Sequence, residues 1–122
     1  MITLRFDIET VSEANRAGHE HWRRRQKRAK AQRHAFRYLW KQQSPPKVTL
    51  PTTVTFIRYA TRRLDHGDNL PMAFKHVRDE LAAIIGIDDS DERIEWRHEQ
   101  RPKDRAEKVR NYFELIIKEQ IP

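Results

Sequence analysis

The segment from Leu70 to Gly86 restricts the fold more than any other part of the sequence. Its apolar residues recur at spacings of four and three. These residues are Leu70, Phe74, Val77, Leu81 and Ile84. The periodicity places them along one side of an α-helix, which must pack against another apolar surface. Pro71 falls in the first turn and Gly86 follows the last, so we predict an amphipathic helix that ends at Gly86.

Segments with alternating apolar residues lie on both sides of this helix in the sequence. ITLRFDIE, residues 2–9, alternates Ile2, Leu4, Phe6 and Ile8 with polar residues, which is the period of a half-buried strand. We predict further strands in KVTLPTTVTFIRYA (47–60), RIEWRHEQ (93–100) and VRNYFELIIKEQ (109–120). Pro51 lacks an N–H donor, so it should lie at an edge or a bulge.

A second, longer helix is predicted between the first two strands. Residues 16–43 are rich in helix formers, contain no proline and end at SPPK, where a helix must stop. The predicted order is strand, helix, strand, helix, strand, strand. This order indicates an α/β fold with a mixed sheet of about four strands and two main helices. At 122 residues, the chain should form a single domain over residues 1–122.

The chain is strongly basic. It has 25 Lys plus Arg against 18 Asp plus Glu and a formal charge of +7. This balance favours a polyanionic partner, nucleic acid first and an anionic membrane surface second. The absence of cysteine excludes disulfides and thiolate metal sites, and no stretch has the pattern of a secretion signal or membrane span. We expect an intracellular protein with no membrane association.

The positive charge is concentrated in the long helix, where Glu20 is the sole acidic counterweight. Its basic residues include Arg23, Arg24, Arg25, Lys27, Arg28, Lys30, Arg33 and Arg37. Like charges four residues apart repel each other, and a bound polyanion would offset that repulsion. The alternative is a solvated face that aids solubility, although such faces usually mix both signs. We expect nucleic-acid contacts from Arg23, Arg24, Lys27, Arg28, Arg62 and Arg63.

Acidic residues gather at both ends of the amphipathic helix. LDHGDNLP, residues 64–71, contains Asp65 and Asp68, while Asp88 and Asp89 follow Gly86. In one interpretation Asp68 or Asn69 caps the helix and the later pair forms an acidic turn. In the other, Asp65, Asp68 and Asp89 hold Mg²⁺ or Mn²⁺. A helix of about 17 residues is roughly 25 Å long, so the three could meet only through the sheet. The residues alone leave both interpretations open.

The run RRLDHGDNL, continued by AFKHVRDELAAIIGIDDSD and RIEWRHEQ, resembles the RusA family of Holliday-junction resolvases. The family pattern is an Asp pair ending in Asp-Asn-Leu, a helix, and then Asp-Asp before a strand. SEANRAGHEHWRRRQKR, starting at Ser12, is similar to a Ser-x-x-Asn segment and a basic helix near the start of the family. The resemblance covers most of the chain, and its specific part is residues 62–100.

The resemblance implies a small α/β domain that forms a homodimer and cleaves branched DNA with Mg²⁺, in the cytoplasm of a bacterial or phage-infected cell. Asp65 and Asp68 match the two metal-binding aspartates of the family, and Asp89 matches the third. One extra residue separates the first pair, which the family writes as Asp-x-Asp. The catalytic lysine of the family corresponds to Met72 here, and Lys75, nearly one turn later, is the expected substitute.

Two other functions are compatible with the sequence. The chain could be a DNA-binding protein of the same fold whose metal site is degenerate, or an RNA-binding or anti-repressor module that uses only the basic helix. Metal-dependent nicking would distinguish the enzyme from both. We also expect Trp22, Trp40 and Trp96 to pack in the core rather than to stack on bases.

Overall fold

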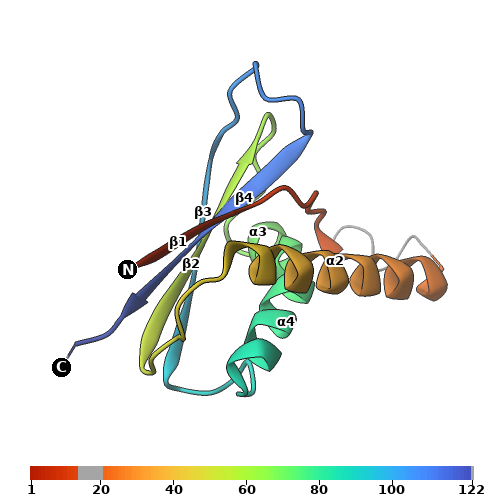
Figure 1. Ribbon diagram of the computed structural model, residues 1–122. Coiled ribbons are helices and arrows are strands. Elements are labelled where there is room, and N and C mark those ends of the chain that lie inside the picture. The colour runs from red at the N-terminus through yellow and green to blue at the C-terminus, as the bar shows by residue number, and fades with distance from the viewer. Residues whose placement is uncertain (14–20, 122) are drawn as a thin grey trace.

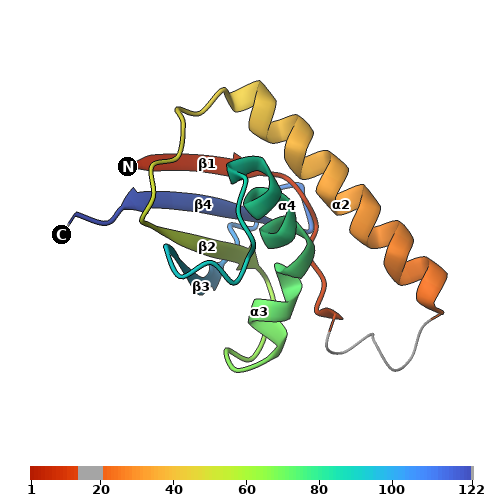
Figure 2. The same cartoon turned by 90° about the horizontal axis from the view of Figure 1, so that it is seen from below.

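The computed structural model describes residues 1–13 and 21–121 (Figures 1 and 2). The helices are α2 (Trp22–Gln43), α3 (Asn69–Ala73) and α4 (Lys75–Ile85). The strands are β1 (Ile2–Phe6), β2 (Thr52–Ala60), β3 (Ile94–Pro102) and β4 (Asn111–Glu119). The predicted strand, helix, strand, helix, strand, strand order is confirmed, with α3 and α4 in the place of the second helix.

The four strands form one mixed sheet in the order β1-β4-β2-β3. β4 runs antiparallel to both β1 and β2, whereas β2 and β3 are parallel and are joined by the crossover through α3 and α4. Figures 1 and 2 show α2, α3 and α4 on the same face of the sheet. The other face carries no helix in the described part of the chain.

A cluster of phenylalanines forms the centre of the core. All five are fully buried, and they come from β1, α2, β2, β4 and the junction of α3 with α4. They are Phe6, Phe36, Phe56, Phe113 and Phe74. Their rings stack or meet edge to face, with centroids 4.5 Å apart for Phe6 and Phe36 and 4.8 Å apart for Phe56 and Phe74. Three of the four strands, the long helix α2 and the junction of α3 with α4 are therefore each anchored by one phenylalanine, and β3 is the strand that contributes none.

The predicted amphipathic helix is divided in two at Phe74. The backbone of Phe74 has φ −104° and ψ 7°, which interrupts the helix between Ala73 and Lys75. The ring of Phe74 also meets Phe113 at 5.3 Å, so the break lies where the side chain enters the core. The predicted end at Gly86 is confirmed, because Gly86 has φ 89° and donates to Ala82 and Ala83.

Several predicted boundaries differ from those observed. β1 ends at Phe6, although the alternation continues to Ile8, which is buried outside the sheet. β2 begins at Thr52, after Pro51, because proline has no N–H for the ladder. Residues 16–20 of the predicted long helix lie outside the described residues. Trp22 is 52% exposed, so its predicted place in the core is wrong, whereas Trp40 and Trp96 do pack against the core.

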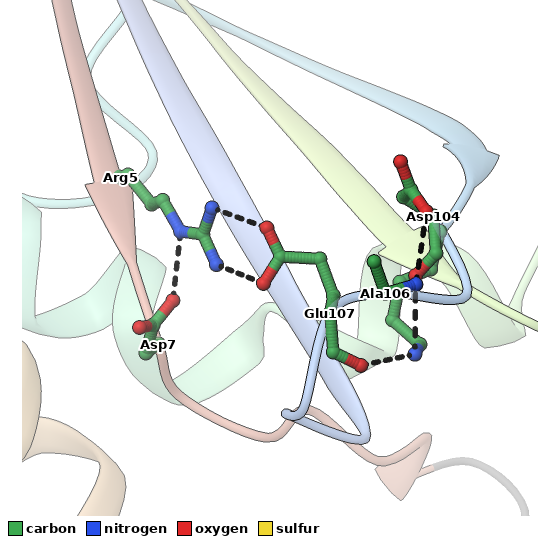
Figure 3. Close-up of polar contacts among 6 residues, drawn as sticks. Arg5, Asp7, Asp104, Ala106 and Glu107 are labelled. Atoms are coloured by element: carbon green, nitrogen blue, oxygen red, sulfur yellow. Dashed lines mark hydrogen bonds and ion pairs between the residues drawn. The ribbon is translucent and has the colours of Figure 1, made fainter.

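The connection between β3 and β4 folds back onto β1 (Figure 3). Arg5 donates to both carboxylate oxygens of Glu107, at 2.9 and 3.0 Å, and to Asp7 at 2.9 Å. The guanidinium of Arg5 also lies 3.9 Å from the centre of the Tyr112 ring. These contacts fix the end of the connection and the start of β4.

Ion pairs from outside α2 neutralise part of its positive charge. Arg28 makes hydrogen bonds of 2.7 Å to each oxygen of Glu13, whose side chain is 3% exposed. Arg33 and Arg37 both donate to Glu80 of α4, at 3.1 and 2.6 Å. These pairs bind α2 to α4 and to the segment after β1. Among helices in the described residues, none is both long enough and apolar enough to cross a membrane.

Replacement of Arg28 by Gln should destabilise the fold. Glu13 would remain buried without its cationic partner, and the loss of one partner of a buried ion pair typically lowers the free energy of unfolding by about 3–5 kcal/mol. Burial alone would raise the pKa of Glu13, but the hydrogen bonds and charge of Arg28 outweigh it and lower that pKa. The stabilisation is therefore present at neutral pH and disappears as the pH falls through the lowered pKa.

Urea unfolding followed by circular dichroism at pH 7 and pH 3 measures this difference. Arg24→Gln, one turn earlier on the exposed side of the same helix, is the matched control and should change stability by less than about 0.5 kcal/mol. Equal effects of the two substitutions at pH 7 would contradict a structural role for Arg28.

Candidate functional site

The acidic loop, residues 64–69, is a tight turn held by Asp65. Its carboxylate accepts hydrogen bonds from the backbone N–H groups of Asp68 at 2.9 Å and Asn69 at 3.3 Å. It also accepts from Nδ2 of Asn69. These hydrogen bonds lower the pKa of Asp65, and the bond from the backbone N–H of Asp68 contributes most. Asp65 is therefore ionised at neutral pH.

Asp68 is the N-cap residue of α3, so the predicted position of the cap is confirmed, although its side chain does not act as one. Asp68 precedes α3, but its side chain makes no capping hydrogen bond. Asp65, three residues earlier, accepts the hydrogen bonds instead. Its carboxylate binds the backbone N–H groups of Asp68 and Asn69 at the start of α3. The side chain of Asp68 is exposed and remains available to a ligand.

Asp89 lies at the other end of α4, in a different environment. Its carboxylate is 4.0 Å from Nε of Arg78, and its backbone oxygen accepts a hydrogen bond of 2.9 Å from Nε1 of Trp96. Arg78 also lies over the Trp96 ring, with 6.0 Å between its Cζ and the ring centre. The neighbouring Asp88 bonds to Ser90 within its own turn.

One face of β3 separates Asp89 from the acidic loop. Trp96 binds the backbone of Asp89, while Gln100 exchanges hydrogen bonds of 2.9 and 2.6 Å with the backbone of Leu64. Trp96 and Gln100 are four residues apart on the strand, roughly 13 Å. The structure therefore brings Asp65 and Asp68 together in one loop and leaves Asp89 farther along the same face. Within the described residues, no group of three or more His, Cys, Asp or Glu side chains is arranged to hold a metal ion.

His98 lies between these two places on β3. Its ring stacks on Phe56 with centroids 5.8 Å apart, and its Nε2 is buried without a hydrogen-bond partner in the described part of the chain. Burial, aided by the charge of Arg78, lowers the pKa of His98 to about 4. His98 is thus neutral near pH 7, and it fills the face between the acidic loop and Asp89.

Lys75 begins α4 and lies 4.0 Å from Asp79, one turn later. No contact joins it to Asp65 or Asp68 in the structure. His66 is exposed within the acidic loop. Arg62 and Arg63, immediately before the loop, are both exposed, and Arg62 takes part in the cavity described below.

Most of the basic residues of α2 fall into two groups. Arg28, Arg33 and Arg37 are held by Glu13 and Glu80, so Arg28 is not free for the predicted phosphate contact. An exposed stripe runs along the side opposite the buried Gln32 and Phe36. The basic stripe consists of Arg23, Lys27, Lys30, His34 and Lys41. These positions recur with the helical period and span about 27 Å of helix axis.

The N-terminal half of α2 extends past the sheet (Figure 2). Arg23 and Lys27 of the predicted phosphate contacts lie on the basic stripe, and Arg24 is exposed beside it. The start of the helix is capped by His21, whose Nδ1 accepts from the N–H of Arg23 at 3.1 Å. A projecting, one-signed helix is a suitable surface for a row of phosphates.

An arginine-lined cavity of about 670 Å³ opens beside the acidic loop. It lies between the segment that follows β1, the end of β2 and the start of β4. Its lining is Glu9, Thr10, Val11, Ser12, Arg58, Ala60, Thr61, Arg62, Leu64, Arg110 and Asn111. Three arginines face one carboxylate there, so the cavity is electropositive.

The cavity wall and the acidic loop are joined by hydrogen bonds. Ser12 donates from Oγ to Oδ1 of Asn69 at 2.5 Å, and the same amide donates from Nδ2 to Asp65. Leu64, the residue before Asp65, is itself part of the lining. An electropositive cavity and a pair of exposed carboxylates are therefore built from one continuous set of contacts.

The sequence did not identify Arg58, Thr10 or Asn111 as site residues. Arg58 interrupts an otherwise apolar or threonine-rich strand, TTVTFIRYA, on the face that packs against the helices. A charged residue at a core-facing strand position was the one signal that could have indicated it. Thr10 and Asn111 are 101 residues apart in the chain, and the fold joins them by three hydrogen bonds of 2.8, 3.3 and 3.4 Å.

Asp65 and Asp68 should respond differently to removal of their carboxylates. Asp65→Ala deletes the acceptor for the N–H groups of Asp68 and Asn69, so both amides should exchange faster with solvent. Asp68→Ala deletes no such acceptor and is the matched control. Hydrogen exchange of these amides, measured by NMR at a fixed pH, tests the assignment. If both variants protect Asn69 equally well, the turn does not depend on Asp65.

The known protein families and the curated proteins provide no match to this chain. The resemblance to the RusA family therefore stays a prediction from the sequence, and the case for function depends on the geometry of the site.

Proposed function

We propose that the protein is a metal-dependent endodeoxyribonuclease that acts on branched DNA. The observation that supports this most is the junction of the acidic loop with the arginine-lined cavity through Ser12 and Asn69. Hydrolysis of a phosphodiester requires a place for a phosphate beside ligands for a divalent cation. The basic stripe of α2 adds a second surface for the DNA backbone.

The donor chemistry of the acidic loop suits Mg²⁺ or Mn²⁺. Asp65 and Asp68 supply hard carboxylate oxygens from one loop, and Mg²⁺ in enzymes is commonly held by one or two carboxylates together with water and substrate phosphate. When bound, such an ion lowers the pKa of a coordinated water and neutralises phosphate charge. Asp89 would need a rearrangement of its turn to join this pair, because it now lies beside Arg78.

Residues of this chain supply the remaining functions. Arg62 and Arg110 place positive charge at the cavity, where they would bind and orient a phosphate and stabilise the charge that develops on its oxygens. Lys75 is a further candidate for that role if the acidic loop closes toward α4. A symmetric cut in a four-way junction needs two such sites, so we propose that the active form is a homodimer bound to branched DNA.

A second candidate function is DNA binding without catalysis. Its support is that the oxygens of Asp65 already accept three hydrogen bonds, while Asp89 has a cationic neighbour. In that case the acidic loop is a structural turn, and the basic stripe and cavity account for the whole activity.

Cleavage of a labelled four-way junction separates the two candidates. The parent protein should cut the junction with Mg²⁺ or Mn²⁺ and not with EDTA, and should cut a matched linear duplex more slowly. Asp68→Asn removes an anionic ligand without removing a hydrogen bond from the turn, so cleavage should fall by about 100-fold or more while junction binding persists.

Asp104→Asn is the control, since Asp104 is an exposed aspartate whose Oδ1 accepts from the N–H of Ala106 in a turn far along the chain. It should cut at the parental rate. If Asp68→Asn also cuts at that rate, the assignment of Asp68 as a metal ligand is wrong. If the parent binds junctions and cuts nothing with either ion, the non-catalytic function replaces the proposal.

The salt dependence of DNA binding should report on the basic stripe. Each phosphate neutralised on duplex DNA adds about 0.9 to the slope of log affinity against log salt. The triple substitution Arg23→Gln, Lys27→Gln and Lys30→Gln should lower that slope by about 2–3 and weaken binding. Fluorescence anisotropy over a series of salt concentrations measures it.

A triple control removes the same charge from the uncovered face of the sheet: Arg97→Gln, Arg101→Gln and Lys118→Gln. These side chains lie on β3 and β4, away from the helices. Their removal should leave the slope within about 1 of the parent. A larger change for the control than for the stripe would place the DNA on the uncovered face.

A further inference from the structure

Arg58 is a buried cation without a carboxylate partner. It lies on β2 with 7% of its surface exposed, and no acidic oxygen within the described residues is close enough to form an ion pair with it. Its Nε donates to Oγ1 of Thr10 at 3.2 Å, and its Nη1 donates to the backbone oxygen of Arg62 at 3.0 Å. Neutral oxygens are its only observed acceptors in the described part of the chain.

Such an arrangement is costly in the absence of a ligand. A buried charge is normally paired with an opposite charge, because hydrogen bonds to neutral groups only partly replace its hydration. Burial lowers the pKa of Arg58, and the charge of Glu9 opposes this shift. Glu9 itself lies 3.6 Å from Arg110, so its charge is shared with an exposed arginine.

The surroundings of Arg58 are fixed before any ligand binds. The N–H of Thr10 donates to Oδ1 of Asn111 at 2.8 Å, and the amide of Gln32 donates to the backbone oxygen of Glu9 at 3.0 Å. These bonds hold the wall of the cavity opposite β2. Arg62 and Arg110 are exposed at its rim, so the positive charge continues from the buried Arg58 to solvent.

We infer that the arginine-lined cavity binds one phosphate group of an unpaired DNA strand, with Arg58 as the recessed ligand and Arg62 and Arg110 at the rim. The inference deepens the proposed function and rests on it for the source of the phosphate. Neither the acidic loop nor the basic stripe supplies this phosphate contact.

The recessed position of Arg58 favours an unpaired strand over a duplex. Phosphates on the convex surface of a duplex are reached by protruding side chains such as those of the basic stripe. A flexible strand can instead turn a phosphate and its nucleotide into a cavity. The volume of about 670 Å³ is within the range of pockets that enclose small organic ligands and exceeds the needs of a lone phosphate.

The test uses the full chain in EDTA, so that no cleavage occurs. Inorganic phosphate is titrated into labelled protein, and the Nε–H signal of Arg58 is followed by NMR. Affinities for a single-stranded oligonucleotide, with either a 5′-phosphate or a 5′-hydroxyl, and for a hairpin duplex of the same length are then measured by anisotropy. The variants are Arg58→Lys and Arg110→Gln, with Arg97→Gln on the uncovered face as the matched control.

Phosphate should shift the Arg58 signal in the parent protein. Arg58→Lys should weaken single-strand binding roughly tenfold, because a lysine at this depth loses the two-sided hydrogen bonding of the guanidinium. Arg110 is exposed, so Arg110→Gln should fold even if Arg58→Lys does not. Arg110→Gln should weaken single-strand binding about threefold. Duplex binding should change no more than it does in Arg97→Gln. A preference for the 5′-phosphate would assign the ligand to strand ends, and equal affinities would assign it to internal phosphates.

Two results would overturn the inference. If both cavity variants behave like Arg97→Gln and phosphate leaves the Arg58 signal unmoved, the cavity is not a phosphate site. If single-strand and duplex affinities fall equally in the cavity variants, the site does not select an unpaired strand. Neither result depends on metal, so a protein that binds strands here yet cuts nothing would refute only the nuclease proposal.

Discussion

The polar segment from Thr10 to Glu13 is the constraint on which the rest of the structure depends. Thr10, Ser12 and Glu13 are buried, at 1%, 6% and 3% exposure, so each must find a partner inside the protein. Thr10 bonds to Asn111 of β4, Ser12 to Asn69 of α3, and Glu13 to Arg28 of α2. Nε2 of His76 on α4 also lies 3.1 Å from Glu13. Four elements are thereby tied to one short stretch of chain.

This segment also decides where the candidate site lies. It forms the wall of the arginine-lined cavity that faces Arg58, and through Ser12 and Asn69 it orients the acidic loop. If Thr10 continued the β1 ladder as a strand, its N–H would pair with a backbone carbonyl and the cavity would not exist. After Phe6, side-chain hydrogen bonds of Asn111 and Gln32 with the backbone of Thr10 and Glu9 take the place of ladder hydrogen bonds.

The charges of α2 serve two separate purposes. Arg28, Arg33 and Arg37 hold the helix on Glu13 and Glu80, where partial burial strengthens each ion pair. The basic stripe, on the side of the helix away from Phe36, is left in water, where the repulsion between its charges is screened and a polyanion can bind. A helix with so thin an apolar seam, centred on Phe36, could not dock by hydrophobic contact alone.

The sequence by itself determined the α/β class, the order of elements, the phenylalanine positions of the strands and the stop at Gly86, because these follow from local periodicity and backbone preference. It also indicated the acidic loop and the basic helix. Only the tertiary structure decided that Asp65 rather than Asp68 holds the turn, that Arg28 forms a structural ion pair, and that Asp89 lies beside Trp96, four residues along β3 from the Gln100 that binds Leu64. It also created the cavity around Arg58. The cavity depends on partners distant in the chain, such as Asn111 for Thr10, and such pairings leave no mark in local spacing. The turn held by Asp65 is local, but Asp65 and Asp68 both lie close enough in the sequence to hold it, so only the folded turn distinguishes them.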